Sequence, residues 1–161
     1  MPWKPDFPGE QPSLGWSILD WMTEMLAQPD CADYRPLQLT AEQAQFILNW
    51  YRVDPATGRF TYRRGIMSRA KGWGKSPMMG AIGAAEALAP VVFDGWDADG
   101  KPVGKPWVEV RTPRVQFAAL NEDQTRNAYE PMAEMLREGP VMDYYDVEPM
   151  ETFVALSLIH I

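Results

Sequence analysis

A glycine-bounded loop that leads into an apolar helix constrains this chain more than any other feature. The residues Gly72-Trp73-Gly74-Lys75-Ser76 follow a short apolar run and precede a stretch rich in Met, Ala, Gly and Ile. Glycine lets backbone N–H groups turn inward without a Cβ clash, and together with the N-terminus of the next helix these groups form an anion-binding concavity. Lys75 would reach terminal phosphates as a point charge, and Ser76 would offer its hydroxyl to Mg²⁺.

This segment has the chemistry of a P-loop, although it departs from the full pattern. The pattern G-x-x-x-x-G-K-[ST] requires glycine five residues before Gly74, and this chain has Arg69 there. The alternative is a glycine-rich turn that a lysine happens to follow. The order of apolar run, loop and helix favours a phosphate site, so we expect Gly72, Trp73, Gly74, Lys75 and Ser76 to bind a nucleoside triphosphate with Mg²⁺ on Ser76.

Apolar spacing and capping residues predict an α/β domain. Helices are expected over about 14–27, 40–52, 78–89 and 123–138, with Ser13, Thr40 and Asn121 as their candidate N-caps. Strands are expected at 59–62, 65–68, 91–93 and 115–120, with a long surface loop over 94–107. Because helices alternate with strands, we expect a parallel sheet flanked by helices. Pro131 is expected to kink or split the last helix.

Composition narrows the class of protein. The 161 residues suffice for one domain with a core, and the net charge of −7 argues against a generic nucleic-acid coat. A local basic patch is nevertheless present, because six cationic residues fall within seventeen positions: Arg59, Arg63, Arg64, Arg69, Lys71 and Lys75. Without a membrane-length apolar stretch or a signal peptide, we expect a cytoplasmic protein. One cysteine and one histidine make an internal disulfide impossible and a structural zinc site implausible.

Three segments share their order and residue types with one family of motors. Residues 39–43, which lead into Phe46 and Trp50, are similar to an adenine-side segment upstream of a P-loop. Residues 62–77 are similar to a deviant Walker A in which a basic residue replaces glycine, and residues 115–120 with 123–125 are similar to the strand and turn that follow. Over about 37–130 the chain thus resembles the ATPase part of the large terminase subunit of tailed bacteriophages.

The resemblance implies the ATP-binding part of a motor that couples ATP hydrolysis to translocation of phage DNA into the capsid. Its cofactors would be ATP and Mg²⁺, and it would work in the host cytoplasm, away from membranes. Its partners would be double-stranded DNA, the small terminase subunit, the portal protein and further copies of itself. A sensor of phosphate charge is implied inside the Walker A, and Arg69 is a better candidate than Lys71 because its fork matches phosphate oxygens. Lys75 and Arg69 are therefore the catalytic candidates, although Arg69 could equally be surface charge.

Other parts of the family pattern are open or absent. Gln43 could pair with an adenine edge, or it could be the Gln of a capping box. A Walker B acid should follow an apolar run, and residues 141–146 fit that poorly. We therefore expect an N-terminal arm and helix over 1–36, followed by an incomplete P-loop ATPase domain over 37–161 without Walker B or nuclease domain. Such a chain alone should bind ATP weakly and not turn it over.

Two other functions remain possible at this point. One is a different P-loop enzyme such as a nucleotide kinase, which would need a lid with arginines, whereas the 94–107 segment offers only Lys101 and Lys105. The other is a non-enzymatic assembly module that keeps the loop for packing alone.

Overall fold

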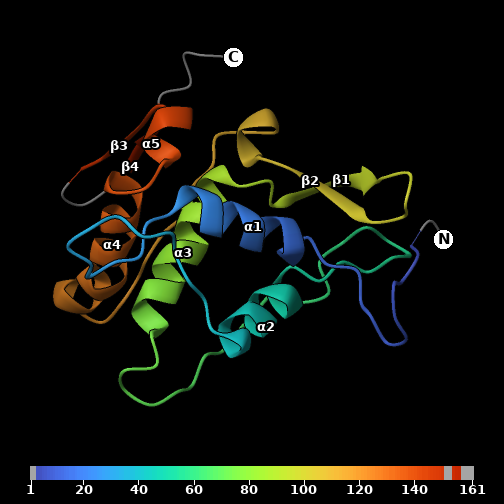
Figure 1. Ribbon diagram of the computed structural model, residues 1–161, viewed down its shortest axis with the longest axis horizontal. Helices are drawn as coiled ribbons and strands as arrows, with labels where there is room; N and C mark the ends of the chain where they lie inside the picture. Colours follow the sequence, from blue (N-terminus) through green and yellow to red (C-terminus); the bar gives the residue numbers. More distant parts are fainter. Residues whose placement is uncertain (1–2, 151–153, 157–161) are drawn as a thin grey trace.

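Helices are the predominant secondary structure of the molecule. The computed structural model describes residues 3–150 and 154–156 (Figure 1). Its helices are α1 (Gly15–Met25), α2 (Ala41–Trp50), α3 (Lys75–Leu88), α4 (Glu122–Arg137) and α5 (Val141–Tyr144), with a 3-10 turn at Trp107–Glu109. Its strands are β1 (Val92–Trp96), β2 (Pro102–Lys105), β3 (Val147–Pro149) and β4 (Val154–Leu156).

The strands form two separate antiparallel hairpins. In one, β1 pairs with β2, and Val92 lies opposite Lys105. In the other, β3 pairs with β4, and Val147 lies opposite Leu156. No parallel pair occurs within residues 3–150 and 154–156. The expected α/β fold, a P-loop NTPase with a parallel sheet flanked by helices, is therefore wrong: this is a mostly helical small domain.

Two runs that were expected to be parallel strands remain unpaired. Residues 65–68 and 115–120 are assigned to no strand. Ile66 is 92% exposed and Leu120 is 96% exposed, so neither apolar side chain is covered. Parallel strands need apolar cover on both faces. Each of these runs packs only one side chain, Met67 or Phe117, partly against the core. Likewise, Phe60 makes only an isolated antiparallel bridge to Val53, and the expected 94–107 loop contains most of the β1–β2 hairpin.

α3 packs against other helices instead of a sheet. It lies along α4 and also contacts α1, as Figure 1 shows. The approach to α4 is close at Gly80, where an added Cβ would lie 3.0 Å from both the Ala128 carbonyl oxygen and the Met132 nitrogen. The prediction of a buried helix with small residues is thus confirmed, although its packing partner is different.

One apolar core joins all five helices to the hairpins. It includes residues from both sides of position 36, where the sequence suggested a boundary. Its largest fully buried side chains are Tyr51, Leu14, Ile18, Met22, Leu26, Ile47, Met78, Met135, Leu136, Val53, Val91 and Val141. Burial of this apolar surface is the main source of stability for the arrangement of helices.

The sequence-based predictions for the ends of α4 and α1 had different outcomes. The Asn121 side chain accepts a hydrogen bond from the Gln124 N–H at 2.9 Å, which confirms the N-cap of α4. Pro131 lies inside α4 but does not split it. Ser13 is not the N-cap of α1, because helix geometry already begins at Leu14.

Ser13 instead ties the start of α1 to α2. Its hydroxyl donates to the Leu48 carbonyl at 2.6 Å and accepts from the Gly15 N–H at 2.9 Å. The first turn of α1 is thereby fixed against the last turn of α2.

Candidate functional site

The segment called the 69–76 loop consists of residues 69–74 and the first two residues of α3, Lys75 and Ser76. Gly72 and Gly74 both adopt left-handed backbone conformations, with φ of +85° and +89°, which favour glycine. Gly74 is the N-cap, no side chain caps this end of the helix, and Pro77 has no N–H to satisfy. The sequence-based expectation that glycines shape this loop is confirmed, and the first turn of α3 can offer N–H groups to an anion.

The Lys75 ammonium turns back into the loop. Its Nζ donates to the backbone carbonyls of Arg69 and Ala70, each at 2.8 Å. Because Lys75 comes six residues after Arg69 and five after Ala70, these two hydrogen bonds close the loop around the Lys75 ammonium. Ser76 follows in the first turn of α3 and is partly exposed.

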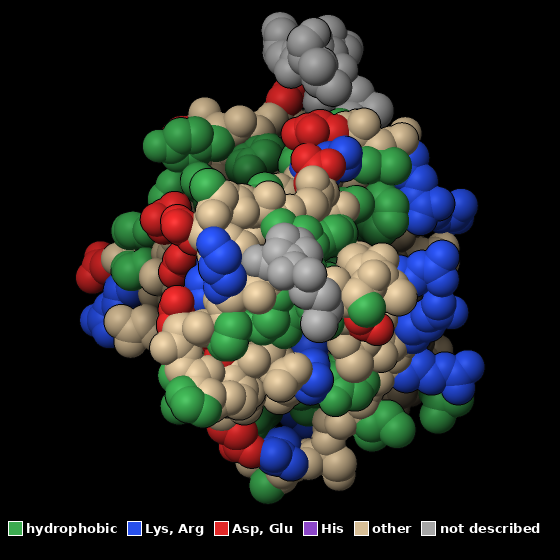
Figure 2. Space-filling model, turned by 90° about the vertical axis from the view of Figure 1, so that its right-hand side faces the viewer, with side chains coloured by type: hydrophobic (Ala, Val, Ile, Leu, Met, Phe, Trp, Pro, Cys, Tyr) green, Lys and Arg blue, Asp and Glu red, His purple; other side chains and the backbone are tan. Residues whose placement is uncertain are grey.

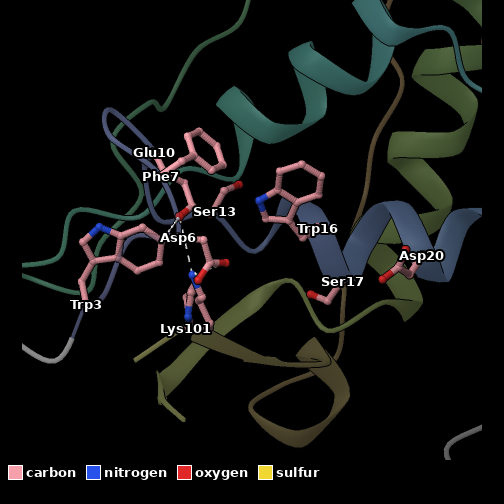
Figure 3. Close-up of a pocket in the computed structure, with 10 residues that line it drawn as sticks. Trp3, Asp6, Phe7, Glu10, Ser13, Trp16, Ser17, Asp20 and Lys101 are labelled. Carbon is pink, nitrogen blue, oxygen red and sulfur yellow. Dashed lines mark hydrogen bonds and ion pairs between the residues drawn. The ribbon is translucent and has the colours of Figure 1, made fainter. Parts of the chain in front are cut away.

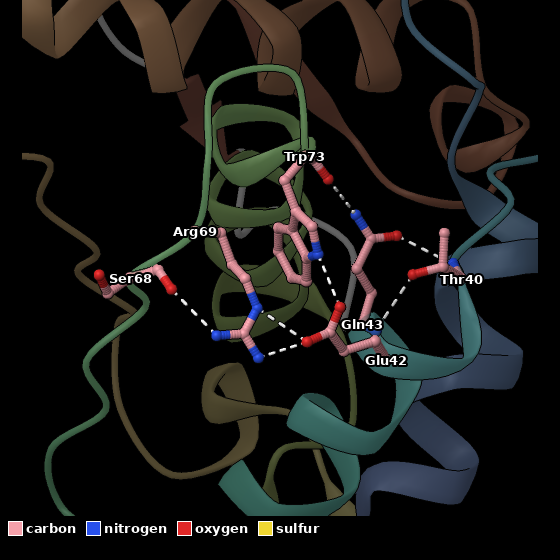
Figure 4. A network of polar contacts seen from close by, with 6 residues as sticks. All are labelled: Thr40, Glu42, Gln43, Ser68, Arg69 and Trp73. Carbon is pink, nitrogen blue, oxygen red and sulfur yellow. Dashed lines mark hydrogen bonds and ion pairs between the residues drawn. The ribbon is translucent and has the colours of Figure 1, made fainter.

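A carboxylate from α2 contacts two side chains of the loop (Figure 4). Glu42 Oε1 accepts from Arg69 Nε at 2.7 Å and from Arg69 Nη2, and Glu42 Oε2 accepts from Trp73 Nε1 at 2.8 Å. The Arg69 guanidinium also lies 5.7 Å from the centroid of the Trp73 ring. The hydrogen bond from Trp73, followed by that from Arg69, lowers the pKa of Glu42 from its usual 4.5. Glu42 is therefore charged at neutral pH and binds two loop side chains at once.

Gln43 joins the same network from the first turn of α2. Its Oε1 accepts from the Thr40 N–H at 2.9 Å, and its own N–H donates to the Thr40 hydroxyl at 3.3 Å. The predicted capping box is thus confirmed. Its Nε2 donates to the Trp73 carbonyl at 3.1 Å, so Gln43 also contacts the loop. The adenine interpretation stays a prediction, and adenine would have to displace these partners of the amide.

The structure brings most of the predicted site residues together. Gln43, Arg69, Trp73 and Lys75 belong to one set of contacts around the loop, whereas Gly72 is exposed with open space at its Cα. Sequence reasoning missed Glu42, which it treated only as part of a helix start. Glu42 lies 27 residues before Arg69, so no local pattern indicates the pair.

Ser76 is the predicted metal ligand of the loop. Within residues 3–150 and 154–156, no group of three or more His, Cys, Asp or Glu side chains could hold a metal ion. A hydroxyl is a suitable oxygen ligand for Mg²⁺, which usually keeps several waters and takes further oxygens from phosphates. The binding of ATP and Mg²⁺ at these residues therefore stays a prediction.

Charge is unevenly distributed over the surface. Figure 2 shows Lys and Arg side chains gathered along one edge of the face, away from most of the Asp and Glu on that face. Within the predicted basic segment, Arg59, Arg63, Arg64 and Lys71 are all exposed. Across the described ranges, no helix is both long enough and apolar enough to cross a bilayer.

Comparison with known proteins identifies phage relatives. The chain is 36% identical over 155 residues to the Gene 13 protein of Mycobacterium phage L5, an alignment that covers 79% of this chain. It is 34% identical over 146 residues to the Gene 13 protein of Mycobacterium phage D29, an alignment that covers 76% of this chain. The chain is homologous to these bacteriophage proteins.

The homology covers only part of each relative. The alignments take in 25% and 23% of the two Gene 13 proteins, so the chain spans about a quarter of the length of the curated relatives it matches. No protein-family model matches the chain, and no solved structure matches it. The expectation of a bacteriophage protein is confirmed, whereas the assignment to the large terminase subunit stays a prediction.

Proposed function

We propose that the 69–76 loop and the N-terminus of α3 bind the phosphates of a nucleoside triphosphate, ATP by the resemblance described above. In this proposal the chain is the ATP-binding part of a phage DNA-packaging motor. The observation that supports it is the position of Lys75, which turns into a loop formed by two left-handed glycines at a helix end without a side-chain cap.

A phosphate would be a stronger partner for Lys75 than its present ones. The ammonium now contacts two neutral carbonyls, and hydrogen bonds between ionised groups are shorter and stronger than those to neutral acceptors. The uncapped N-terminus of α3 adds N–H donors and the positive end of the helix dipole. Exchange of carbonyls for phosphate oxygens at Lys75 would therefore be favourable.

Arg69 and Ser76 have supporting roles in this proposal. Arg69 would neutralise phosphate charge, and it would have to exchange Glu42 for the ligand. Ser76 would place its hydroxyl on the Mg²⁺ that accompanies ATP. These residues bind and orient the ligand, while coupling of hydrolysis to DNA movement is proposed for the whole protein.

The proposed partners follow from the motor. They are double-stranded DNA, the small terminase subunit, the portal protein and further copies of the chain, in the host cytoplasm. Exposed Arg59, Arg63, Arg64 and Lys71 support DNA contact, because clustered cations release the counterions of the phosphate backbone.

A non-enzymatic assembly module is the second candidate function. The observation that favours it is the internal pairing of the loop: Gln43, Arg69, Trp73 and Lys75 all have partners within the protein. A loop that serves only to join α2 to α3 would have the same contacts.

Calorimetric titration with a non-hydrolysable ATP analogue and Mg²⁺ distinguishes the two. We expect the native chain to bind and Lys75→Ala to lose affinity by about 10- to 100-fold, since a hydrogen bond to a charged group contributes about 1.5–3 kcal/mol. Lys71→Ala, which removes the same charge from an exposed position of the same loop, should change affinity little. Absence of binding by the native chain, or equal losses in both variants, would contradict the proposal.

The variant Gln43→Ala separately tests whether Gln43 recognises the adenine base of the nucleotide. Because both amide atoms of Gln43 are paired with Thr40 and Trp73, we expect ATP and GTP affinities to change alike. The melting temperature should also fall, since a helix cap contributes about 1 kcal/mol. A selective loss of ATP affinity would instead support the adenine contact.

A further inference from the structure

A second site lies at the N-terminal end of α1. A cavity of about 580 Å³ separates three parts of the chain: the N-terminal arm (residues 3–12), the first turns of α1, and the start of β2 (Figure 3). Aromatic rings and carboxylates dominate its wall. The lining residues are Trp3, Asp6, Phe7, Glu10, Ser13, Trp16, Ser17, Asp20, Lys101 and Pro102.

One end of this cavity already holds a cation of the protein itself. Lys101 Nζ lies 2.8 Å from Asp6 Oδ2 and 3.5 Å from Glu10 Oε2. It also donates to the Lys4 carbonyl at 3.0 Å and lies 4.8 Å from the centroid of the Trp3 ring. Carboxylates and an aromatic face thus surround an ammonium group here, and the arm is fixed to the β1–β2 hairpin.

The other end has the same kinds of group without a cation. Trp16 and Phe7 line the cavity and are 52% and 56% exposed, so their rings are accessible to a ligand. Asp20 lies one helical turn after Trp16, on the same side of α1. The Asp20 carboxylate makes no hydrogen bond or ion pair with the described part of the chain. Since Lys101 offsets only one of three carboxylates, the cavity keeps a net negative charge.

We propose that this end of the cavity binds an arginine side chain from a segment of a partner protein. A guanidinium is flat, stacks on aromatic faces and is weakly hydrated, so it suits the exposed Trp16 ring. Its N–H fork would pair with the Asp20 carboxylate. The volume exceeds that of one side chain, which leaves room for the backbone on either side of the arginine. This inference is independent of nucleotide binding at the loop.

Peptide titrations of the full chain test the proposal. The probes are the blocked tripeptide Gly-Arg-Gly and the same peptide with citrulline, which has nearly the same shape and no charge. Binding is followed by ¹H–¹⁵N NMR at the indole N–H signals of Trp3 and Trp16. We expect saturable shifts with the arginine peptide and about tenfold weaker binding of the citrulline peptide. Equal binding of the two peptides would overturn the proposal.

Variants of α1 then locate the contact. Asp20→Asn should weaken binding of the arginine peptide about threefold, and Trp16→Leu should weaken it about five- to tenfold. The matched control is Glu24→Gln, which removes one charge from an exposed position of the same helix outside the cavity. It should leave affinity unchanged. Equal losses in Asp20→Asn and Glu24→Gln would mean diffuse attraction to negative charge and would also overturn the proposal.

Discussion

Replacement of Tyr51 by phenylalanine should destabilise the protein by about 1.5–3 kcal/mol. The Tyr51 side chain is 1% exposed, and its hydroxyl donates to Glu86 Oε1 at 2.9 Å. Tyr51 directly follows α2 and Glu86 belongs to α3. This hydrogen bond therefore joins the end of α2 to α3, the two helices that contribute side chains to the 69–76 loop site. Tyr51→Phe removes the donor and leaves the ring in place.

The magnitude follows from the charge of the acceptor. Hydrogen bonds to charged groups contribute about 1.5–3 kcal/mol, more than those between neutral groups, and the loss leaves a carboxylate oxygen without this partner. Burial, and then the charge of Glu86, raises the pKa of Tyr51 well above its usual range, so the phenol remains a donor at neutral pH. For a chain of this size, we expect the melting temperature to fall by about 3–12 °C.

Thermal melts and urea titrations followed by circular dichroism provide the measurement. Tyr34→Phe is the matched control, because Tyr34 is 52% exposed, and it should change stability by no more than about 0.5 kcal/mol. The double variant Tyr51→Phe/Glu86→Gln should show a coupling energy, since the two side chains are in contact. A loss in Tyr51→Phe no larger than in Tyr34→Phe would refute this account of how α2 and α3 are joined.

Three further predictions concern the pH dependence of the loop, a close backbone approach and a helix cap. The pKa of Glu42 is lowered below 4.5, so its contact with the Trp73 indole should persist above pH 4.5. The contact should be lost as the pH falls through the lowered pKa. The NMR signal of the Trp73 indole N–H, followed from about pH 6 to about pH 2, should therefore show a midpoint below 4.5. Gly104→Ala would place a Cβ 2.0 Å from the Pro90 carbonyl oxygen, so we expect destabilisation of at least about 1–3 kcal/mol in urea titrations. Asn121→Ala should cost about 1 kcal/mol and lower the melting temperature.

The helix ends could be predicted because their signals are local. Thr40 and Gln43 cap the same helix turn, and Asn121 caps the next residues of its own helix. Such contacts need only four neighbouring residues in the right order. The same holds for Gly72 and Gly74, whose left-handed conformations follow from the tight loop that they form.

The sheet could not be predicted correctly because strands depend on distant partners. Residues 65–68 and 115–120 have the composition of short strands, yet no neighbour pairs with them and Ile66 and Leu120 stay in water. The sequence indicated a short strand at 91–93, but β2 and the rest of β1 formed where the Gly and Asp residues of 94–107 indicated a loop. A run of apolar residues cannot by itself show whether another strand will be available.

What the sequence determined by itself was the glycine loop with Lys75, the helix that follows it, and the caps of α2 and α4. Only the tertiary structure decided that α3 packs on α4 rather than on a sheet, and that Glu42 holds Arg69 and Trp73. The reason is the range of the interactions. Caps and turns act within a few residues, whereas core packing brings α2 to the loop across about thirty residues, and it depends on how all the apolar faces of the chain are buried together.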